Sequence, residues 1–220
     1  ARHFYHHAGW AQLQESEFPD HDPLGVIGQI IPWNFPFLML AWKIAPALAL
    51  GNTVVLKPSE QDPLTHQKIV QLAEEAGLPP GVLNVVHGGR ETVESICDHP
   101  EIAGVSFVGS SEVAKIVYTR ATASGKRAQT LGGAKNYLIV LPDADMDATL
   151  EACAGSIFGS TGQRCLAGSV VVGVGDAHAQ IRERLLDHAA SIRVGDGMDA
   201  GTDMGPVISG AHRDRVNSFI

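Results

Sequence analysis

The chain has 220 residues, of which 45% are hydrophobic, and it carries a formal net charge of -8 at pH 7. The hydrophobic content suffices for a sizeable core in one large domain or two small ones, whereas the acidic balance, without clustered Lys and Arg, excludes a nucleic-acid-binding role. No stretch approaches the length of a membrane span, the first residues lack the apolar core of a signal peptide, and three cysteines at unrelated spacings form no disulfide or metal framework, so we expect a cytoplasmic protein.

Residues 1–24 are expected to hold the end of a helix and a connecting segment. His3, His6 and His7 fall on neighbouring helical positions, but no carboxylate or cysteine joins them at ligand spacing, so we interpret them as a solvated helix end and not as a metal site. Residues 11–24 are polar and contain two prolines, which predicts an irregular or hairpin connection.

Residues 25–131 alternate short apolar strands with helices. The predicted strands are 25–31, 53–57, 82–87, 104–108 and 128–131, and the predicted helices are 38–50, 63–76, 91–97 and 112–123. Gly51 and Gly77 follow two of these helices, at the position where glycine commonly ends a helix. Strands and helices that alternate at this spacing predict a parallel, doubly wound α/β sheet.

The pattern restarts at residue 132, after which a second α/β unit, 132–220, is expected. It comprises a strand at 137–141, a helix at 148–158 behind an aspartate-rich cap, a strand at 169–174, a helix at 179–190 and a glycine-rich loop at 195–206. We place the boundary between the two parts near Leu131, beside the Gly132 and Gly133 pair.

Cys165 is the principal candidate for chemistry. It closes the sequence GQRC at residues 162–165, so its thiol lies in a glycine-containing turn beside the guanidinium of Arg164. Positive charge favours the thiolate, which is the reactive form of a thiol. Residue type alone also allows a small buried hydrophobe, and that is the simpler interpretation of Cys97 and Cys153, which lie among apolar neighbours within helices.

Further candidates follow two of the predicted strands. Gly109, Ser110 and Ser111 lie between a strand and a helix, where backbone N–H groups can bind a pyrophosphate, although such serines are also ordinary helix caps. Lys57, Ser59 and Glu60 follow another strand, where open α/β sheets bind ligands, although a charged strand end in solvent is the alternative. The usual dinucleotide fingerprint GxGxxG is absent.

Three motifs in one order, IPWNFP at 31–36, LGGAKN at 131–136 and GQRC at 162–165, resemble the NAD(P)-dependent aldehyde dehydrogenase superfamily. The resemblance runs from about residue 8 to the end, and within the superfamily it is strongest to the coenzyme A-acylating methylmalonate-semialdehyde (malonate-semialdehyde) dehydrogenases. It implies a Rossmann-like cofactor domain, partly present at 25–131, joined to a catalytic domain that begins at 132. Since the family is about twice as long, it also implies a central fragment of a homo-oligomeric enzyme, without turnover in isolation.

The resemblance assigns roles to three residues. Cys165 is the nucleophile, the Asn34 amide and the Cys165 backbone N–H form an oxyanion hole, and Arg164 orients the distal carboxylate of a semialdehyde. From the residues alone, Asn34 is equally a turn former between two prolines, and Arg164 is equally a residue that holds a loop carbonyl. The second Arg that related enzymes use has no counterpart here.

The resemblance also implies an NAD site. Its residues lie at the ends of the predicted strands or just after them: Ile31, Pro32, Trp33, Lys57, Ser59, Glu60, Gly109, Ser110, Leu131 and Gly132. Ala114 stands where many relatives carry glycine. NAD is preferred to NADP because a Glu60 carboxylate that binds the ribose 2′-hydroxyl would repel a 2′-phosphate.

Thr130 departs from the commoner pattern of the superfamily, in which a Glu immediately before LGG activates water against the acyl-enzyme. A threonine hydroxyl cannot accept a proton near neutral pH, so hydrolysis should be slow and coenzyme A should take the acyl group. We therefore predict NAD-dependent oxidation of a malonate-type semialdehyde to an acyl-CoA with loss of CO₂. The alternatives are a hydrolytic aldehyde dehydrogenase that releases a free acid, and a non-catalytic nucleotide-binding module.

Overall fold

The computed structural model describes residues 1–220 as two units, Ala1–Gly133 and Ala134–Ile220. The first unit contains a five-stranded parallel sheet and two apolar clusters. The second contains a two-stranded parallel sheet and one apolar cluster. None of the helices combines the length and the apolar character that a membrane span requires.

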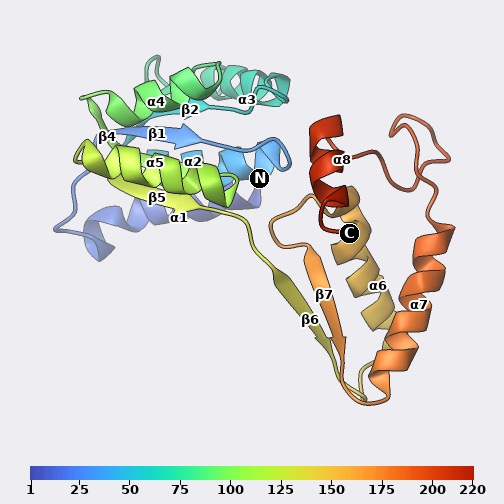
Figure 1. Ribbon diagram of the computed structural model, residues 1–220. Coiled ribbons are helices and arrows are strands. Elements are labelled where there is room, and N and C mark those ends of the chain that lie inside the picture. The colour runs from blue at the N-terminus through green and yellow to red at the C-terminus, as the bar shows by residue number, and fades with distance from the viewer. The chain divides into compact units, whose positions relative to one another are not determined.

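Five parallel strands form the sheet of the first unit (Figure 1). They are β1 (Val26–Ile30), β2 (Thr53–Lys57), β3 (Leu83–Val85), β4 (Ile102–Val108) and β5 (Arg127–Leu131). Their order in the sheet is β3-β2-β1-β4-β5, with every neighbouring pair parallel. The predicted doubly wound α/β fold is confirmed, because the chain winds outward from β1 to β3 and then returns to build β4 and β5 on the other side.

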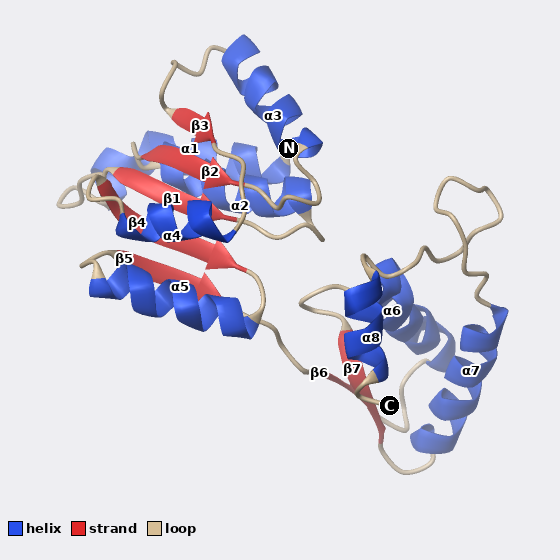
Figure 2. Ribbon diagram, turned by 45° about the horizontal axis from the view of Figure 1, so that its top comes forward, coloured by secondary structure: helices blue, strands red, loops and turns tan.

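Four helices cover the two faces of this sheet (Figure 2). They are α2 (Pro36–Ala49), α3 (Leu64–Glu75), α4 (Arg90–Asp98) and α5 (Ser111–Ala123). Val54 and Leu56 of β2 pack with α2 and α3, whereas Val55 between them packs with the cluster of α4 and α5. Successive side chains of a strand point to opposite faces, so the central strands are apolar on both sides and require helices on both.

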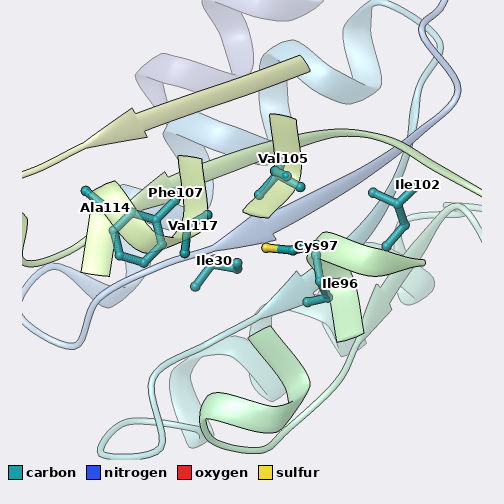
Figure 3. Packing of buried hydrophobic residues seen from close by; sticks show 9 residues of the cluster. Ile30, Ile96, Cys97, Ile102, Val105, Phe107, Ala114 and Val117 are labelled. Atoms are coloured by element: carbon teal, nitrogen blue, oxygen red, sulfur yellow. The ribbon is translucent and has the colours of Figure 1, made fainter. Parts of the chain in front are cut away.

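The cluster under α4 and α5 includes one of the three cysteines. Figure 3 shows Cys97 among Ile30 of β1, Val105 and Phe107 of β4 and Val117 of α5. Cys97 is completely buried, and burial raises the pKa of its thiol above the ordinary value. The prediction that Cys97 belongs to the core is confirmed.

The first helix, α1, extends over Arg2–Glu17, so the predicted irregular connection at 11–24 is wrong for residues 11–17. The helix gains support from α2, because Trp42 Nε1 donates to His3 Nε2 over 2.6 Å and Phe4 packs against the cluster under α2. These tertiary contacts stabilise a helix whose own residues bury none of their side chains completely. The irregular part is shorter and contains Pro19 and Pro23.

The second unit contains the strands β6 (Asn136–Val140) and β7 (Gly168–Gly173) and the helices α6 (Met146–Phe158), α7 (Ala177–Ser191) and α8 (Gly210–Asn217). Asp145 caps α6 by accepting from the backbone N–H groups of Asp147 and Ala148, as an N-cap aspartate does. Cys153 of α6 is buried in the cluster of this unit with Val140 of β6, which confirms its prediction as a core residue.

Candidate functional site

The predicted cofactor residues of the first unit all lie at the carboxyl ends of parallel strands or in the loops that follow them. The loop after β1 and the loop after β4 diverge at the point where the order of winding reverses, since β1 lies between β2 and β4. Open α/β sheets bind ligands outside the carboxyl ends of the strands at such a switch point. The register places Ile30 beside Lys57 and Phe107, which brings the three strand ends to one edge of the sheet.

The β4 and β5 loops meet at the start of α5. Gly109 N–H donates to the Leu131 carbonyl over 3.1 Å, and Gly133 N–H donates to Ser111 Oγ over 3.0 Å. A Cβ atom on Gly132 would come within 2.9 Å of Ser111 Cα, so only glycine fits between the β5 loop and the helix. The sequence analysis placed Ser111 in this strand-to-helix run but assigned only Gly109 and Ser110 to the cofactor, so the contact of its hydroxyl with the β5 loop was missed.

Ser110 caps α5, and its side chain accepts from the N–H of Val113 over 3.4 Å. This is the helix-cap role that the sequence left open for a serine between a strand and a helix. The cap does not use the N–H groups of Ser111 and Glu112, which have no intrahelical acceptor in the first turn of a helix. The start of α5 therefore keeps donors that could bind an anion.

Lys57 and Glu60 form an ion pair after β2. Lys57 is buried, with its Nζ 2.9 Å from Glu60 Oε2, and the Glu60 side chain remains 55% exposed. Partial burial is the largest single influence and raises the pKa of Glu60, but the hydrogen bond from Lys57, a backbone hydrogen bond and the positive charge of Lys57 together outweigh it and hold that pKa below its ordinary value. Glu60 is thus a carboxylate near neutral pH, as the NAD interpretation requires, and Ser59 beside it is buried.

The loop after β1 leads directly into α2. Ile31 continues the strand, since its N–H donates to the Lys57 carbonyl over 3.2 Å, and it is buried in the cluster under α2. Pro32, Trp33 and Asn34 are half-buried in the turn that follows. Pro36 begins the helix at a position where the absent N–H of proline costs no hydrogen bond.

In the second unit, the segment before Cys165 has an unusual backbone. Ser160 and Thr161 have φ values of 52° and 57°, in the left-handed region that is costly for a β-branched residue such as threonine. Two contacts hold this segment. Thr161 Oγ1 donates to the Gly205 carbonyl over 3.0 Å, and the Ile208 N–H donates to Gln163 Oε1 over 3.0 Å.

Cys165 differs from the other two cysteines in its exposure. It is half-buried, whereas Cys97 and Cys153 are buried and burial raises the pKa of both thiols. A buried thiol with a raised pKa is inert, so Cys165 is the thiol of this chain that a substrate can approach.

The guanidinium of Arg164 donates hydrogen bonds to two residues of the second unit. Its Nε donates to Ser160 Oγ over 3.2 Å and its Nη1 donates to the Gly155 carbonyl of α6 over 3.3 Å. This arrangement is a structural role like the second interpretation of Arg164, although the carbonyl that it binds belongs to the last turn of α6 and not to a loop. The two hydrogen bonds use two of the five N–H donors of the guanidinium, so a role of Arg164 in substrate binding stays a proposal.

Asn136 is a residue that the sequence analysis quoted only as part of a motif. Its Nδ2 donates to the Cys165 carbonyl over 2.8 Å and to the Ala167 carbonyl over 3.0 Å. The signal that could have found it is its place at the start of a strand, next to a glycine pair and in the same unit as the cysteine.

The sequence model described as the aldehyde dehydrogenase family matches residues 2–220. A malonate-semialdehyde dehydrogenase of Oceanobacillus iheyensis is 50% identical over 198 residues, which are 90% of this chain and 41% of that protein. A malonate-semialdehyde dehydrogenase of Geobacillus kaustophilus is also 50% identical over the same shares. The chain therefore spans about two fifths of the length of these relatives.

Solved structures agree with the sequence comparisons. The crystal structure of methylmalonate-semialdehyde dehydrogenase from Oceanimonas doudoroffii superposes with a TM-score of 0.85 at 45% identity, covering 90% of this chain and 41% of the other. A betaine aldehyde dehydrogenase from Staphylococcus aureus in complex with NAD⁺ superposes with a TM-score of 0.91 at 35% identity, covering 99% of this chain and 45% of the other.

Proposed function

Since the chain belongs to the aldehyde dehydrogenase family, we propose that its residues serve the NAD-dependent oxidation of a carboxylated semialdehyde, with transfer of the acyl group to coenzyme A. Malonate or methylmalonate semialdehyde is the proposed substrate, because the relatives at 45–50% identity carry these names. The sequence analysis also predicts a cytoplasmic location and a homo-oligomeric state, and both remain predictions.

The observation that carries the proposal is the half-buried thiol of Cys165 in its glycine-bounded turn. Attack of this sulfur on an aldehyde carbon forms a thiohemiacetal whose oxygen carries negative charge. We propose that the amide of Asn34 and the backbone N–H of Cys165 donate to this oxygen, and one such donor typically contributes about 3 kcal/mol.

The first unit fits NAD at its carboxyl edge. The start of α5 offers backbone donors for a pyrophosphate, the glycine at 132 allows the chain to approach this helix closely, and the ionised Glu60 can accept from a ribose hydroxyl. When bound, NAD supplies the acceptor for the hydride that leaves the thiohemiacetal. A thioester then remains on Cys165.

The release of this thioester depends on Thr130, which lies half-buried on β5 beside Phe107 of β4. A hydroxyl at this position provides no general base for water, and loss of a positioned base costs a factor of about 10² to 10⁴. Coenzyme A needs no such base because its thiolate is itself nucleophilic. We therefore favour thioester exchange with coenzyme A over hydrolysis, and the β-carboxylate is lost as CO₂.

Steady-state NADH formation tests this proposal in an active polypeptide that carries these residues. Addition of malonate semialdehyde and NAD without coenzyme A should give a single-turnover burst, and coenzyme A should restore continuous turnover. Steady turnover to a free acid without coenzyme A would instead show the hydrolytic alternative.

The Cys165→Ala variant separates catalysis from binding. It should abolish the burst and leave NAD binding intact, because the thiol is not a proposed cofactor contact. NAD binding without any burst in the unsubstituted protein would favour the third interpretation, a nucleotide-binding module.

A further inference from the structure

The segment that carries Cys165 is a short turn, and hydrogen bonds hold several of its backbone groups. The Ala167 N–H donates to the Arg164 carbonyl over 3.1 Å, which closes a turn with Cys165 as its second residue. The next N–H, that of Gly168, donates to Ser156 Oγ of α6 over 2.9 Å. The carbonyls of Cys165 and Ala167 both accept from Asn136.

Asn136 reaches this turn because β6 and β7 are parallel. Parallel strands begin at the same end of their sheet, so the first residue of β6 lies beside the chain that enters β7, and Asn136 pairs with Gly168. The register shifts by one residue between Asn136 and Tyr137. Such an irregularity redirects a side chain at the end of a ladder.

The contact acts on the geometry of the thiol. The carbonyl of Cys165 belongs to the peptide plane that follows its Cα, so holding this oxygen limits the ψ angle of Cys165 and with it the direction of the Cα–Cβ bond. Asn136 uses both hydrogens of its amide nitrogen, one for each carbonyl. One side chain thus holds the nucleophile's own residue and the second residue after it.

We propose that Asn136 is a positioning residue for Cys165, which orients the thiol for attack by clamping the carbonyls of Cys165 and Ala167. The proposal rests on the function inferred above and adds a residue that does not touch the substrate. A misplacement of about 1 Å at a reacting group can cost roughly a hundredfold in rate. The clamp should therefore act on the rate of acyl-enzyme formation and leave the affinity for NAD unchanged.

The experiment compares Asn136→Leu with Ser156→Ala in an active polypeptide that carries these residues. Asn136→Leu keeps a similar side-chain volume but has no donors. Ser156→Ala removes the hydrogen bond to the N–H of Gly168, which begins β7 three residues after Cys165. We expect Asn136→Leu to slow the NADH burst by between about tenfold and a hundredfold, with an unchanged dissociation constant for NAD. Ser156→Ala should leave the burst rate unchanged.

Alkylation by iodoacetamide, followed by mass spectrometry, provides a second measurement that needs neither NAD nor turnover. Cys153 is buried in the same unit and reports on unfolding. In Asn136→Leu the labelling rate of Cys165 should rise relative to that of Cys153, because the released turn opens locally. Should Asn136→Leu also expose Cys153, Asn136→Asp, which keeps the shape and removes the donors, takes its place.

The NADH burst and the labelling ratio distinguish a failure of the proposed function from a failure of the proposed role of Asn136. An unsubstituted protein without a burst would refute the proposed function, while a raised ratio of Cys165 to Cys153 labelling would still support the clamp. A burst rate in Asn136→Leu equal to that of the unsubstituted protein, or an equal loss in Ser156→Ala, would overturn the positioning role. An unchanged labelling ratio in a folded variant would overturn it as well.

Discussion

The guanidinium of Arg164 lies against the backbone of Gly159, where a Cβ atom would come within 2.5 Å of Arg164 Nη1. The same guanidinium donates to the Gly155 carbonyl and to Ser160 Oγ. The absence of a side chain at residue 159 is therefore what allows the residue before the nucleophile to bind the end of α6.

Gly159→Ala should displace the guanidinium and weaken both hydrogen bonds, which lowers the free energy of unfolding by about 1 kcal/mol. Gly155→Ala is the matched control, since a Cβ there meets no atom within 4 Å and alanine favours a helix interior by roughly 0.5–1 kcal/mol. Urea unfolding of both variants measures the difference. Equal stabilities of the two variants would contradict this account.

Arg164→Gln tests whether the same guanidinium also selects the substrate. A charged hydrogen bond to a carboxylate contributes about 1.5–3 kcal/mol, so kcat/KM for malonate semialdehyde should fall by about tenfold or more relative to that for an uncharged aldehyde of similar length. An equal fall for the two aldehydes would leave Arg164 with the structural role that its contacts with Ser160 and Gly155 already show.

Glu60→Gln should weaken the preference for NAD. The glutamine keeps a hydrogen-bond acceptor for a ribose hydroxyl but removes the negative charge that would repel a 2′-phosphate. We expect the ratio of kcat/KM for NADP to that for NAD to rise by about tenfold, which corresponds to about 1.4 kcal/mol. Parallel assays with the two cofactors measure it, and an unchanged ratio would remove Glu60 from the cofactor site.

Lys43 of α2 makes the stability of the first unit depend on pH. It is 8% exposed, its ammonium donates to Ser106 Oγ of β4, and burial lowers its pKa from 10.5 to about 8. Between these two pH values the unfolded chain retains a proton that the folded chain has lost, so folding becomes more favourable as the pH rises. The gain approaches about 3 kcal/mol once both states are neutral.

Lys43→Met should remove this rise, so the free energy of unfolding of the variant relative to the unsubstituted protein should fall across pH 8 to 10.5. Guanidinium unfolding at a series of pH values measures the difference, in which other titrating groups cancel. The matched control is Lys115→Met on the exposed face of α5, which should follow the unsubstituted protein at every pH. If the difference in the free energy of unfolding between Lys43→Met and the unsubstituted protein did not change with pH, the amine of Lys43 would not be desolvated in the folded protein.

Most strands and helices could be predicted from the sequence because local patterns decide them. A buried parallel strand is apolar on both faces, as at Thr53–Lys57, and glycines such as Gly51 mark helix ends. The length of α1 was missed because its residues have no strong apolar stripe and gain their support from α2, a contact that a local pattern does not contain.

The sequence by itself determined which side chains could do chemistry, since a thiol, an amide and a carboxylate have their reactivity from their atoms. Only the tertiary structure decided their environments, because burial and hydrogen bonds depend on segments distant in the chain. The clamp of Asn136 on the carbonyl of Cys165 spans 29 residues. Arg164 faces Gly155 because α6 ends beside it, and the left-handed backbone of Thr161 persists because Gly205 holds its hydroxyl.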